Sequence, residues 1–330
     1  MRPAFTIALS VFWLMAAAPA ASAGHRAVQP APVLWRDPGD ISSRNLFYGS
    51  GGEKNQPRLP ARFIKEDMKG TNPKFDVRDQ DDKKWKVKLG VEARPETVAT
   101  RLLWSVGYFT DEDYFIPNLT ISDLPGRLQR GQNFVNQQNE VENARLKRDM
   151  NGTEKRGQWR WRHNPFTGTR EFNGLRVMMA LINNWDLKDE NNAIEEEKTT
   201  GREFYVVTDL GASLGTIGYA LEPGRGKGRL QDYRASKFIT KVRHDSVDFS
   251  VPARMTLLGI FKPRSFFTRL RLRWIGRHIP RSDAKWIGGL LAQLKPSQIE
   301  DAFRAAGYSQ NDIDAYSAVV EKRIAQLNRL

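Results

Sequence analysis

The sequence predicts a mixed α+β fold in which a small β-rich part precedes a larger helical part. One observation behind this prediction is the alternation of apolar and polar residues between 63 and 90, which indicates a β-hairpin. Another is the helical spacing of apolar residues over 94–106 and over 171–183. The chain has 330 residues, of which 40% are apolar and 27% charged. Such a chain can bury a sizeable core, as one two-lobed unit or as two small domains.

The N-terminal region has the features of a secretory signal peptide. Arg2 supplies a positive charge, residues 5–18 are almost wholly apolar, and small residues at 21–23 form a cleavage sequence. We therefore expect residues 1–23 to be removed after Ala23 and the protein to be exported, to the periplasm or outside the cell. A membrane anchor is the alternative, although the apolar run is short for a span.

The next regions are predicted to be an irregular arm and a β-rich lobe. Residues 24–62 are rich in Pro, Gly and Ser, and they are expected to pack on the first lobe as an arm. The lobe covers 63–165. It contains the hairpin, a helix over 94–106 and a strand over 114–121. Residues 122–157 are polar, and they are expected to form an inserted, solvated helix and loop.

A lysine and two glutamates connect the hairpin with the helix that follows it. Lys88 lies near the end of the second hairpin strand, Glu92 precedes the helix, and Glu96 lies in its first turn. Glu96 is the favoured partner of Lys88 and Glu92 is the alternative. Two other interpretations remain open: Lys88 could face solvent on an amphipathic strand, and Glu96 could simply favour the helix N-terminus.

The second lobe, over 166–330, carries polar residues in two adjacent loops. After the apolar helix over 171–183 the chain reads Asn-Trp-Asp-Leu-Lys-Asp-Glu-Asn, with Asp186, Lys188 and Asn191 at fixed spacing. An apolar strand then leads into Asp209-Leu210-Gly211, eighteen residues after Asn191. Asp and Asn are also frequent in ordinary turns, so each motif alone is weak. Their order, after a lysine hairpin and a glutamate helix, is more specific.

These motifs resemble the catalytic loop and the metal-binding loop of protein kinases. The hairpin with the preceding Gly70-x-x-x-Lys74 resembles the nucleotide loop and lysine strand of HipA-type serine/threonine kinases. The resemblance covers about 63–250. It implies a two-lobed kinase-like fold that transfers a phosphoryl group from ATP, with Mg²⁺ or Mn²⁺, to a hydroxyl of a protein or small molecule.

The resemblance also implies a role for each motif residue. Asp186 and Lys188 would be catalytic, Asp186 at the acceptor hydroxyl and Lys188 at the γ-phosphate. Asn191 and Asp209 would bind the metal. Nucleotide binding would use the remaining residues: Lys88, Glu96, Gly70, Thr71, Asn72 and Lys74.

Some features depart from this pattern. The His-Arg that usually precedes the catalytic Asp is Asn184-Trp185 here, the phosphate loop has little Gly, and Lys88 and Glu96 are only eight residues apart. The alternative function is therefore a non-catalytic pseudokinase or an envelope interaction module. Its basic surface, from 52 Lys and Arg against 38 Asp and Glu, would bind anionic partners.

Two basic segments and the C-terminal region complete the prediction. Residues 158–162 alternate Trp and Arg, which indicates a strand with a buried Trp face; nucleic-acid binding is a weaker interpretation. Residues 264–281 interleave apolar residues with Arg, which fits a helix with an apolar core face or an anionic membrane surface. Helices are expected to begin at Ser297 and Ser309. The absence of Cys excludes disulfides and thiolate metal sites.

Overall fold

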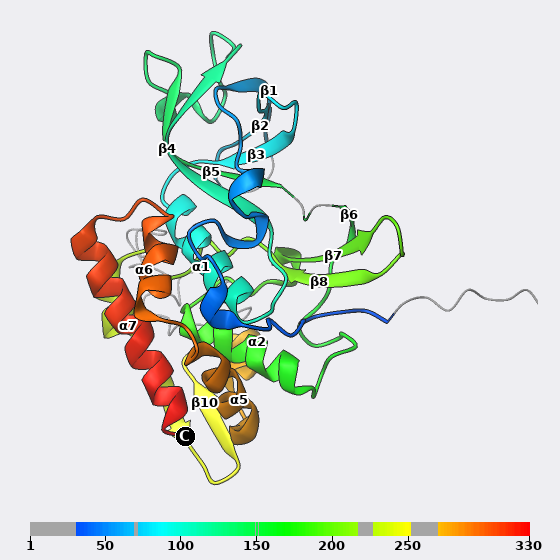
Figure 1. The fold of residues 1–330 in the computed structure, drawn as a ribbon, viewed down its shortest axis with the longest axis vertical. Helices are drawn as coiled ribbons and strands as arrows, with labels where there is room; N and C mark the ends of the chain where they lie inside the picture. The colour runs from blue at the N-terminus through cyan, green and yellow to red at the C-terminus, as the bar shows by residue number, and fades with distance from the viewer. Residues whose placement is uncertain (1–30, 69–71, 149, 151, 217–226, 252–269) are drawn as a thin grey trace, which may run out of the picture.

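The computed structural model describes residues 31–68, 72–148, 150, 152–216, 227–251 and 270–330. The chain is mixed α+β, with a β-barrel at one end and most helices at the other (Figure 1). The predicted signal peptide lies outside the described residues. Among the helices in the described ranges, none is long and apolar enough to cross a membrane.

The β-rich part is a closed barrel of five strands in the order β1-β2-β3-β5-β4. Parallel pairing of β1 with β4 closes it, whereas the other neighbours are antiparallel. The predicted hairpin is confirmed as β2 and β3, whose Phe75, Val77, Trp85 and Val87 are fully buried in the barrel. The strands are β1 Ala61–Asp67, β2 Lys74–Arg78, β3 Lys84–Lys88, β4 Glu112–Ser122 and β5 Glu140–Arg148.

The prediction of a solvated insert over 122–157 was wrong. This segment contains β5, which lies between β3 and β4 in the barrel, and also β6, Thr153–Gly157. Val141, Ala144 and Leu146 of β5 are buried, as a barrel strand requires. The strand was missed because the intervening Arg145 is charged, and a buried arginine with acidic partners has the same sequence signal as a solvated one.

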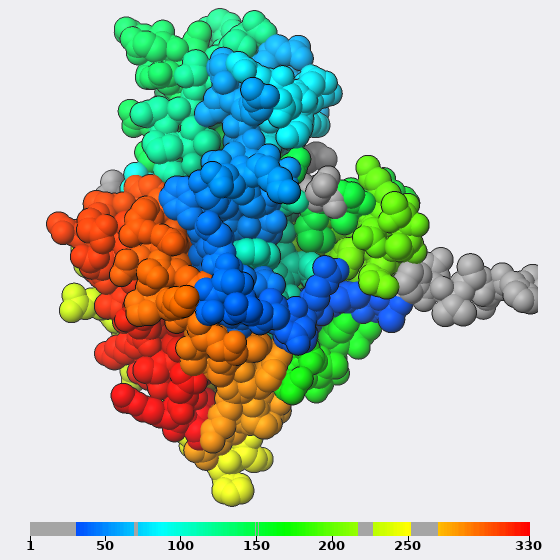
Figure 2. All heavy atoms as spheres, viewed as in Figure 1, coloured from blue at the N-terminus to red at the C-terminus, as the bar shows by residue number. Residues whose placement is uncertain are grey.

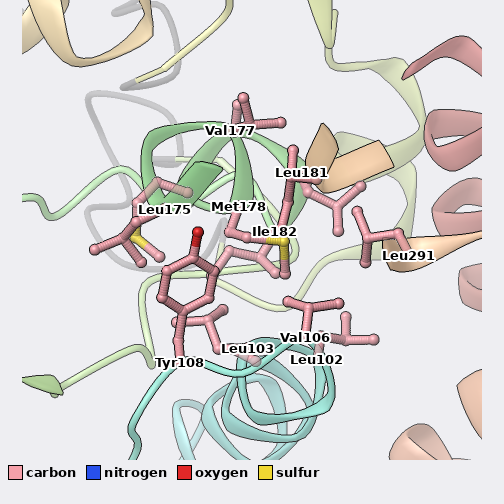
Figure 3. Close-up of a cluster of buried hydrophobic side chains, with 14 of the residues drawn as sticks. Leu102, Leu103, Val106, Tyr108, Leu175, Val177, Met178, Leu181, Ile182 and Leu291 are labelled. Atoms are coloured by element: carbon pink, nitrogen blue, oxygen red, sulfur yellow. The ribbon is translucent and has the colours of Figure 1, made fainter. Parts of the chain in front are cut away.

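The helix α1, Ala93–Ser105, connects the two parts of the molecule. It was predicted within one residue at each end. One side contacts β4 and β5, and another contacts α6. Figure 3 shows Leu102, Leu103 and Val106, from α1 and the residue after it, in one cluster with Leu175 and Met178 of α2. The main core thus fixes α1 against the helical part.

The helical part has two small sheets beside its helices. The helices are α2 Arg170–Leu181, α3 Leu230–Ala235, α5 Arg281–Leu291, α6 Pro296–Arg304 and α7 Gln310–Asn328. One sheet, in the order β6-β7-β8, contains β7 Asn192–Glu197 and β8 Glu203–Val207. The other, in the order β11-β10-β9, contains β9 Ile239–Val242, β10 Ser246–Phe249 and β11 Ile279–Pro280.

The described part of the arm, 31–60, runs along the surface where the barrel meets the helices (Figure 2). It contains three short 3₁₀ turns, η1 Ile41–Ser43, η2 Gly49–Gly51 and η3 Glu53–Asn55. The side-chain amide of Gln298 in α6 donates to the carbonyls of Ile41 and Arg44, at 2.9 and 2.8 Å. These bonds attach the arm to the helical part.

Two predicted elements differ from the structure. Residues 158–162 form no strand, although Trp159 and Trp161 are buried while Arg160 and Arg162 are exposed, as the alternation indicated. Side-chain bonds replace a strand ladder here: the Nε1–H of Trp159 donates to the carbonyl of Val206 in β8 at 2.9 Å. The first C-terminal helix begins at Pro296 rather than at Ser297, with Lys295 as its N-cap.

Candidate functional site

Lys88 lies where the barrel meets α1, and three carboxylates surround it. Its Nζ is 2.8 Å from Glu96 Oε2 and 2.9 Å from Glu92 Oε2, and it also contacts Asp209 Oδ1. The short distance in sequence does not prevent pairing with Glu96, because β3 ends at Lys88 and the chain reverses at Gly90, whose φ of +82° is easy only for glycine. Both glutamates therefore bind the same ammonium group.

A buried network of charges fixes Glu96 from its other side. Arg145 of β5 lies 3.0 Å from Glu96 Oε1 and 3.5 Å from Asp113 of β4. Asp113 in turn pairs with Arg101 of α1 and accepts a bond from Thr100 at 3.1 Å. Because each carboxylate has a cation on either side, the network can stay charged inside the protein and hold the Glu96 side chain in one orientation.

The charges of this cluster reinforce one another. Burial opposes the positive charge of Lys88, but Glu96, Asp209 and Glu92 outweigh it and raise the pKa of Lys88 above its usual range. Burial likewise opposes the negative charge of Asp209, yet Lys88, with Lys147 and Lys74, holds the pKa of Asp209 well below its usual range. The lysine and the aspartate are therefore both charged at neutral pH.

Asp209 reaches Lys88 through an unusual backbone turn after β8. Its φ is +53°, a left-handed conformation that Asp tolerates better than most residues. Leu210 is fully buried, and Gly211 packs against Glu92 so closely that a Cβ at 211 would lie 2.6 Å from the Glu92 Cβ. The Asp-Leu-Gly turn therefore lies directly against the start of α1, and Gly211 is required by that contact.

The loop with Asp186 is held by bonds from its own residues and from the Asp-Leu-Gly turn. Asn184 Oδ1 accepts from the backbone N–H of Asp186 at 3.0 Å, and the N–H of Trp185 donates to the carbonyl of Ala212 at 3.2 Å. Asn184 and Trp185, the two residues that replace the His-Arg of the kinase pattern, therefore position the loop. The Asp186 carboxylate pairs with Lys188 at 2.8 Å.

Asn191 links the same loop to the residue before Asp209. Its Nδ2 donates to the carbonyl of Asp186 at 2.7 Å, and its carbonyl accepts from the N–H of Thr208 at 2.9 Å. The structure thus brings Asp186, Lys188 and Asn191 into one loop that is bonded to the chain beside Asp209. The amide group of Asn191 also carries an oxygen, which is the atom that metal binding would use.

A helix far along the chain stabilises the start of this loop. Arg323 of α7 is buried, and its Nη1 donates to the carbonyls of Ala180 and Leu181, at 3.0 and 2.8 Å. These carbonyls belong to the last turn of α2, where a helix leaves acceptors without intrahelical partners. Arg323 thereby caps the helix that leads into Asp186.

Three carboxylates could hold a divalent cation here. Oxygens of Glu92, Glu96 and Asp209 lie within 4.8 Å of one another, and hard oxygen donors of this kind suit Mg²⁺ and Mn²⁺. Lys88 already balances part of their charge. The side chain of Asp209 is 43% exposed, whereas those of Glu92 and Glu96 are at most 7% exposed. The donor set therefore fits a metal that is reached from the Asp209 side.

The predicted nucleotide loop is described only in part. Gly70 and Thr71 lie outside the described residues, and Asn72 is partly buried ahead of β2. Lys74 is paired directly with Lys88 in the β2–β3 ladder. Burial and the nearby Lys88 lower the pKa of Lys74, although Asp209 partly compensates.

Sequence reasoning missed two lysines of this site. Lys147 of β5 pairs with Asp111 at 2.5 Å and contributes to the low pKa of Asp209. Lys227 contacts Glu92, and its Nζ lies 5.7 Å from the centre of the Trp185 ring. Lys147 was missed together with β5, the strand in which it lies. The local signal for Lys227 is the run of Gly, Lys and Arg in which it lies, a basic sequence suited to an anionic substrate that does not indicate its contact with Glu92.

The sequence matches no protein-family model and no curated protein. Several solved structures are similar, among them structures of two kinases. The proinflammatory kinase CtkA of Helicobacter pylori has 12% identity and a TM-score of 0.44, over 83% of this chain and 98% of that one. The Golgi casein kinase has 10% identity and a TM-score of 0.34, over 83% and 73% of the two chains. The same kinase with Mn and ADP bound has 9% identity and a TM-score of 0.31, over 82% and 75%. At TM-scores below 0.5 these similarities do not decide the function.

Proposed function

We propose that the protein is a kinase-like phosphotransferase that uses ATP with Mg²⁺ or Mn²⁺. The observation that supports this most strongly is the convergence of Lys88, Glu96 and Asp209 from a barrel strand, a helix and a loop. Lys88 and Asp209 are 121 residues apart in sequence, so their contact results from the fold. In this proposal the barrel and the helical part are the two lobes of a kinase-like fold, and the resemblance to HipA-type kinases remains a prediction.

The chain's own residues would share the work of phosphoryl transfer. Lys88, oriented by Glu96, would bind phosphate oxygens, and Lys74 and Lys147 would add positive charge beside them. Asp186 would accept the proton of the acceptor hydroxyl as that oxygen attacks phosphorus, and ADP would leave. When bound, the metal ion would neutralise charge on the phosphates, held by Asp209 with Asn191 or Glu92.

The acceptor and the location of the reaction are also part of the proposal. A carboxylate at the catalytic position suits a hydroxyl acceptor, on a protein or a small molecule. The apolar run over 5–18 and the cleavage sequence at 21–23 support export, to the periplasm or outside the cell. Because ATP is scarce there, the enzyme needs a compartment that supplies nucleotide, or else another phosphodonor.

Two variants separate nucleotide binding from transfer. We would measure the melting temperature with and without ATP and Mg²⁺ or Mn²⁺. Ligand at a hundredfold excess over its Kd stabilises the folded state by about 2.7 kcal/mol. Asp209→Asn should lose this metal-dependent shift. Asp186→Asn should keep it but lower phosphate transfer from labelled ATP by roughly 10²- to 10⁴-fold, because it removes a general base.

The matched control is Glu190→Gln, which removes an exposed carboxylate from the same loop. It should retain both the shift and the transfer. Equal transfer by Asp186→Asn and the unmodified protein would refute the assigned mechanism. A shift that survives in Asp209→Asn would remove Asp209 from the metal site.

The second candidate is a pseudokinase or envelope interaction module without catalysis. The observation that favours it is the pairing of Lys88 with three carboxylates, since a lysine so fully neutralised must exchange a partner before it can bind phosphate. This candidate predicts no transfer with any metal or nucleotide, and binding of anionic partners that weakens with salt.

A further inference from the structure

A second concentration of positive charge lies around Trp274, and none of the residues that line it belongs to the Lys88 cluster. Its exposed members, Arg162, Arg271, Arg273, Arg277 and His278, are called the arginine surface here. Together with Arg176, Leu270 and Trp274 they line a cavity of about 550 Å³. The 3₁₀ turn η7, Arg273–Gly276, forms its centre.

A buried arginine fixes the backbone beneath the arginine surface. The guanidinium of Arg176, from α2, donates to the carbonyls of Trp274, Ile275 and Arg277, at 2.9, 2.9 and 2.6 Å. The Arg176 guanidinium therefore binds the backbone of the turn itself and not an external anion. The turn is consequently held in one conformation, which presents the neighbouring arginines to solvent.

The exposed arginines have no acidic partner. Among the residues that the structure describes, no carboxylate forms an ion pair with Arg162, Arg271, Arg273 or Arg277. Asp248 accepts a bond from the backbone N–H of His278 at 2.9 Å, but its carboxylate is already paired with Arg243 at 2.8 Å. Like charges held close together without counter-charges favour the binding of an anion.

The sequence around the turn has the same bias. No Asp or Glu occurs between Asp248 and Asp283, whereas Arg and Lys recur throughout and alternate with large apolar residues. Leu270 is 46% exposed beside Arg271. Exposed apolar side chains next to arginines are typical of surfaces that lie on membranes, where the apolar group enters the headgroup region.

We propose that the arginine surface binds the phosphate headgroups of an anionic phospholipid membrane. Guanidinium groups bind phosphate oxygens through two parallel hydrogen bonds, and several of them on one rigid turn can engage neighbouring headgroups. Leu270 would insert beside them. The proposal is independent of the phosphotransfer activity, because it uses none of those residues.

The arginine surface lacks an open aromatic ring for stacking, which argues against single-stranded nucleic acid as its ligand. Such binding uses exposed rings on which bases stack. The ring of Trp274 is already covered by two guanidinium groups, those of Arg162 at 4.9 Å and Arg176 at 5.2 Å. Trp159 and Trp161 are buried. The arginine surface therefore offers charge and an aliphatic side chain, but no open aromatic face.

Vesicle co-sedimentation tests the proposal. The chain without residues 1–23 is used, because that apolar segment would itself enter lipid. The protein should bind vesicles of phosphatidylcholine with 30% phosphatidylglycerol and not vesicles of phosphatidylcholine alone. The triple variant Arg271→Ala, Arg273→Ala, Arg277→Ala should bind on the order of a hundredfold more weakly, since each arginine at an anionic surface contributes about a factor of five.

The matched control removes three exposed cations from the barrel and from the arm beside it: Arg58→Ala, Arg62→Ala and Lys65→Ala. Each of these residues pairs with an aspartate, and the change in net charge is the same. This variant should bind anionic vesicles like the unmodified protein. Equal losses in the two triple variants would show that only net charge matters, and unchanged binding of the arginine variant would also overturn the proposal.

Two further experiments identify the source of the anion. The triple variant Arg271→Lys, Arg273→Lys, Arg277→Lys keeps the charge but loses the two parallel hydrogen bonds of each guanidinium group, so it should bind vesicles more weakly than the unmodified protein. Inorganic phosphate and single-stranded DNA are titrated in parallel. Binding of either one that requires the arginines, together with no binding to anionic vesicles, would assign the surface to a soluble anion and refute the membrane.

Discussion

The Lys88 cluster and the arginine surface are both strongly charged, yet they are built in opposite ways. Lys88 is buried and shares three carboxylates, and the network continues through Glu96 to Arg145 and Asp113. The arginine surface is exposed, and within the described ranges it has no acidic partner. Buried charges must be paired to be tolerated, and pairing fixes their positions. Exposed, unpaired charges contribute little to the fold and remain available to a ligand.

The largest expected effect comes from removing a partner inside the paired cluster. Glu96→Ala leaves both Lys88 and Arg145 with less counter-charge in a buried environment, so it should lower the free energy of unfolding by about 3 to 5 kcal/mol. Denaturant unfolding measures this. Glu190→Ala, at an exposed position, should change stability by no more than about 0.5 kcal/mol. A cost below about 1 kcal/mol for Glu96→Ala would mean that its charge is not needed to balance the two cations.

An intermediate effect is expected at Asp248, a largely buried carboxylate that is paired with Arg243 near the surface. Hydrogen bonds from Arg243, and one from the backbone of His278, lower the pKa of Asp248 to about 2. A carboxylate whose pKa is lowered by folding stabilises the folded state at pH values above its ordinary pKa, which is near 4. This contribution disappears as the pH falls to about 2. Asp248→Asn should thus cost about 1 kcal/mol at neutral pH.

The pH dependence of the same variant provides the check. Melting temperatures of the unmodified protein and of Asp248→Asn should differ at pH 6 and converge between pH 4 and pH 2. A difference that stays constant over this interval would show that the carboxylate charge contributes nothing, and that the variant acts through lost hydrogen bonds alone.

The smallest effect on stability is expected at the arginine surface. The triple variant Arg271→Ala, Arg273→Ala, Arg277→Ala should unfold within about 0.5 kcal/mol of the unmodified protein, because these side chains lose no partner. Removing mutual repulsion should even stabilise it slightly at low salt, and this gain should vanish at high salt. Denaturant midpoints at two salt concentrations measure both. A marked loss of stability would show that these arginines serve the fold.

Elements encoded by local apolar spacing could be predicted from the sequence, whereas elements that depend on paired buried charges could not. The hairpin, α1 and α2 were predicted because apolar spacing encodes them locally. The strand β5 was not, because Arg145 is buried only on account of Glu96 and Asp113, which come from other elements. The order of the motifs predicted that Lys88 and Asp209 belong to one site, but not that they touch, and the contact of Lys227 with Glu92 depends on how a distant loop returns to α1. Local patterns show which residues are charged, and the fold decides which of them are paired.

The cap that Arg323 places on α2 has a consequence for when the proposed site can form during synthesis. A chain made from its N-terminus contains every motif residue once it passes Asp209, but Arg323 lies 143 residues after Ala180, whose carbonyl it binds. Until α7 has been made and has docked, the last turn of α2 lacks the bonds from Arg323 and keeps those from the Tyr233 hydroxyl to Leu181 and from the Asn183 N–H to Ala180. If the proposed phosphotransfer is correct, a chain that lacks α7 would carry the complete set of motifs and still transfer phosphate poorly, because α2 would lack the cap from Arg323.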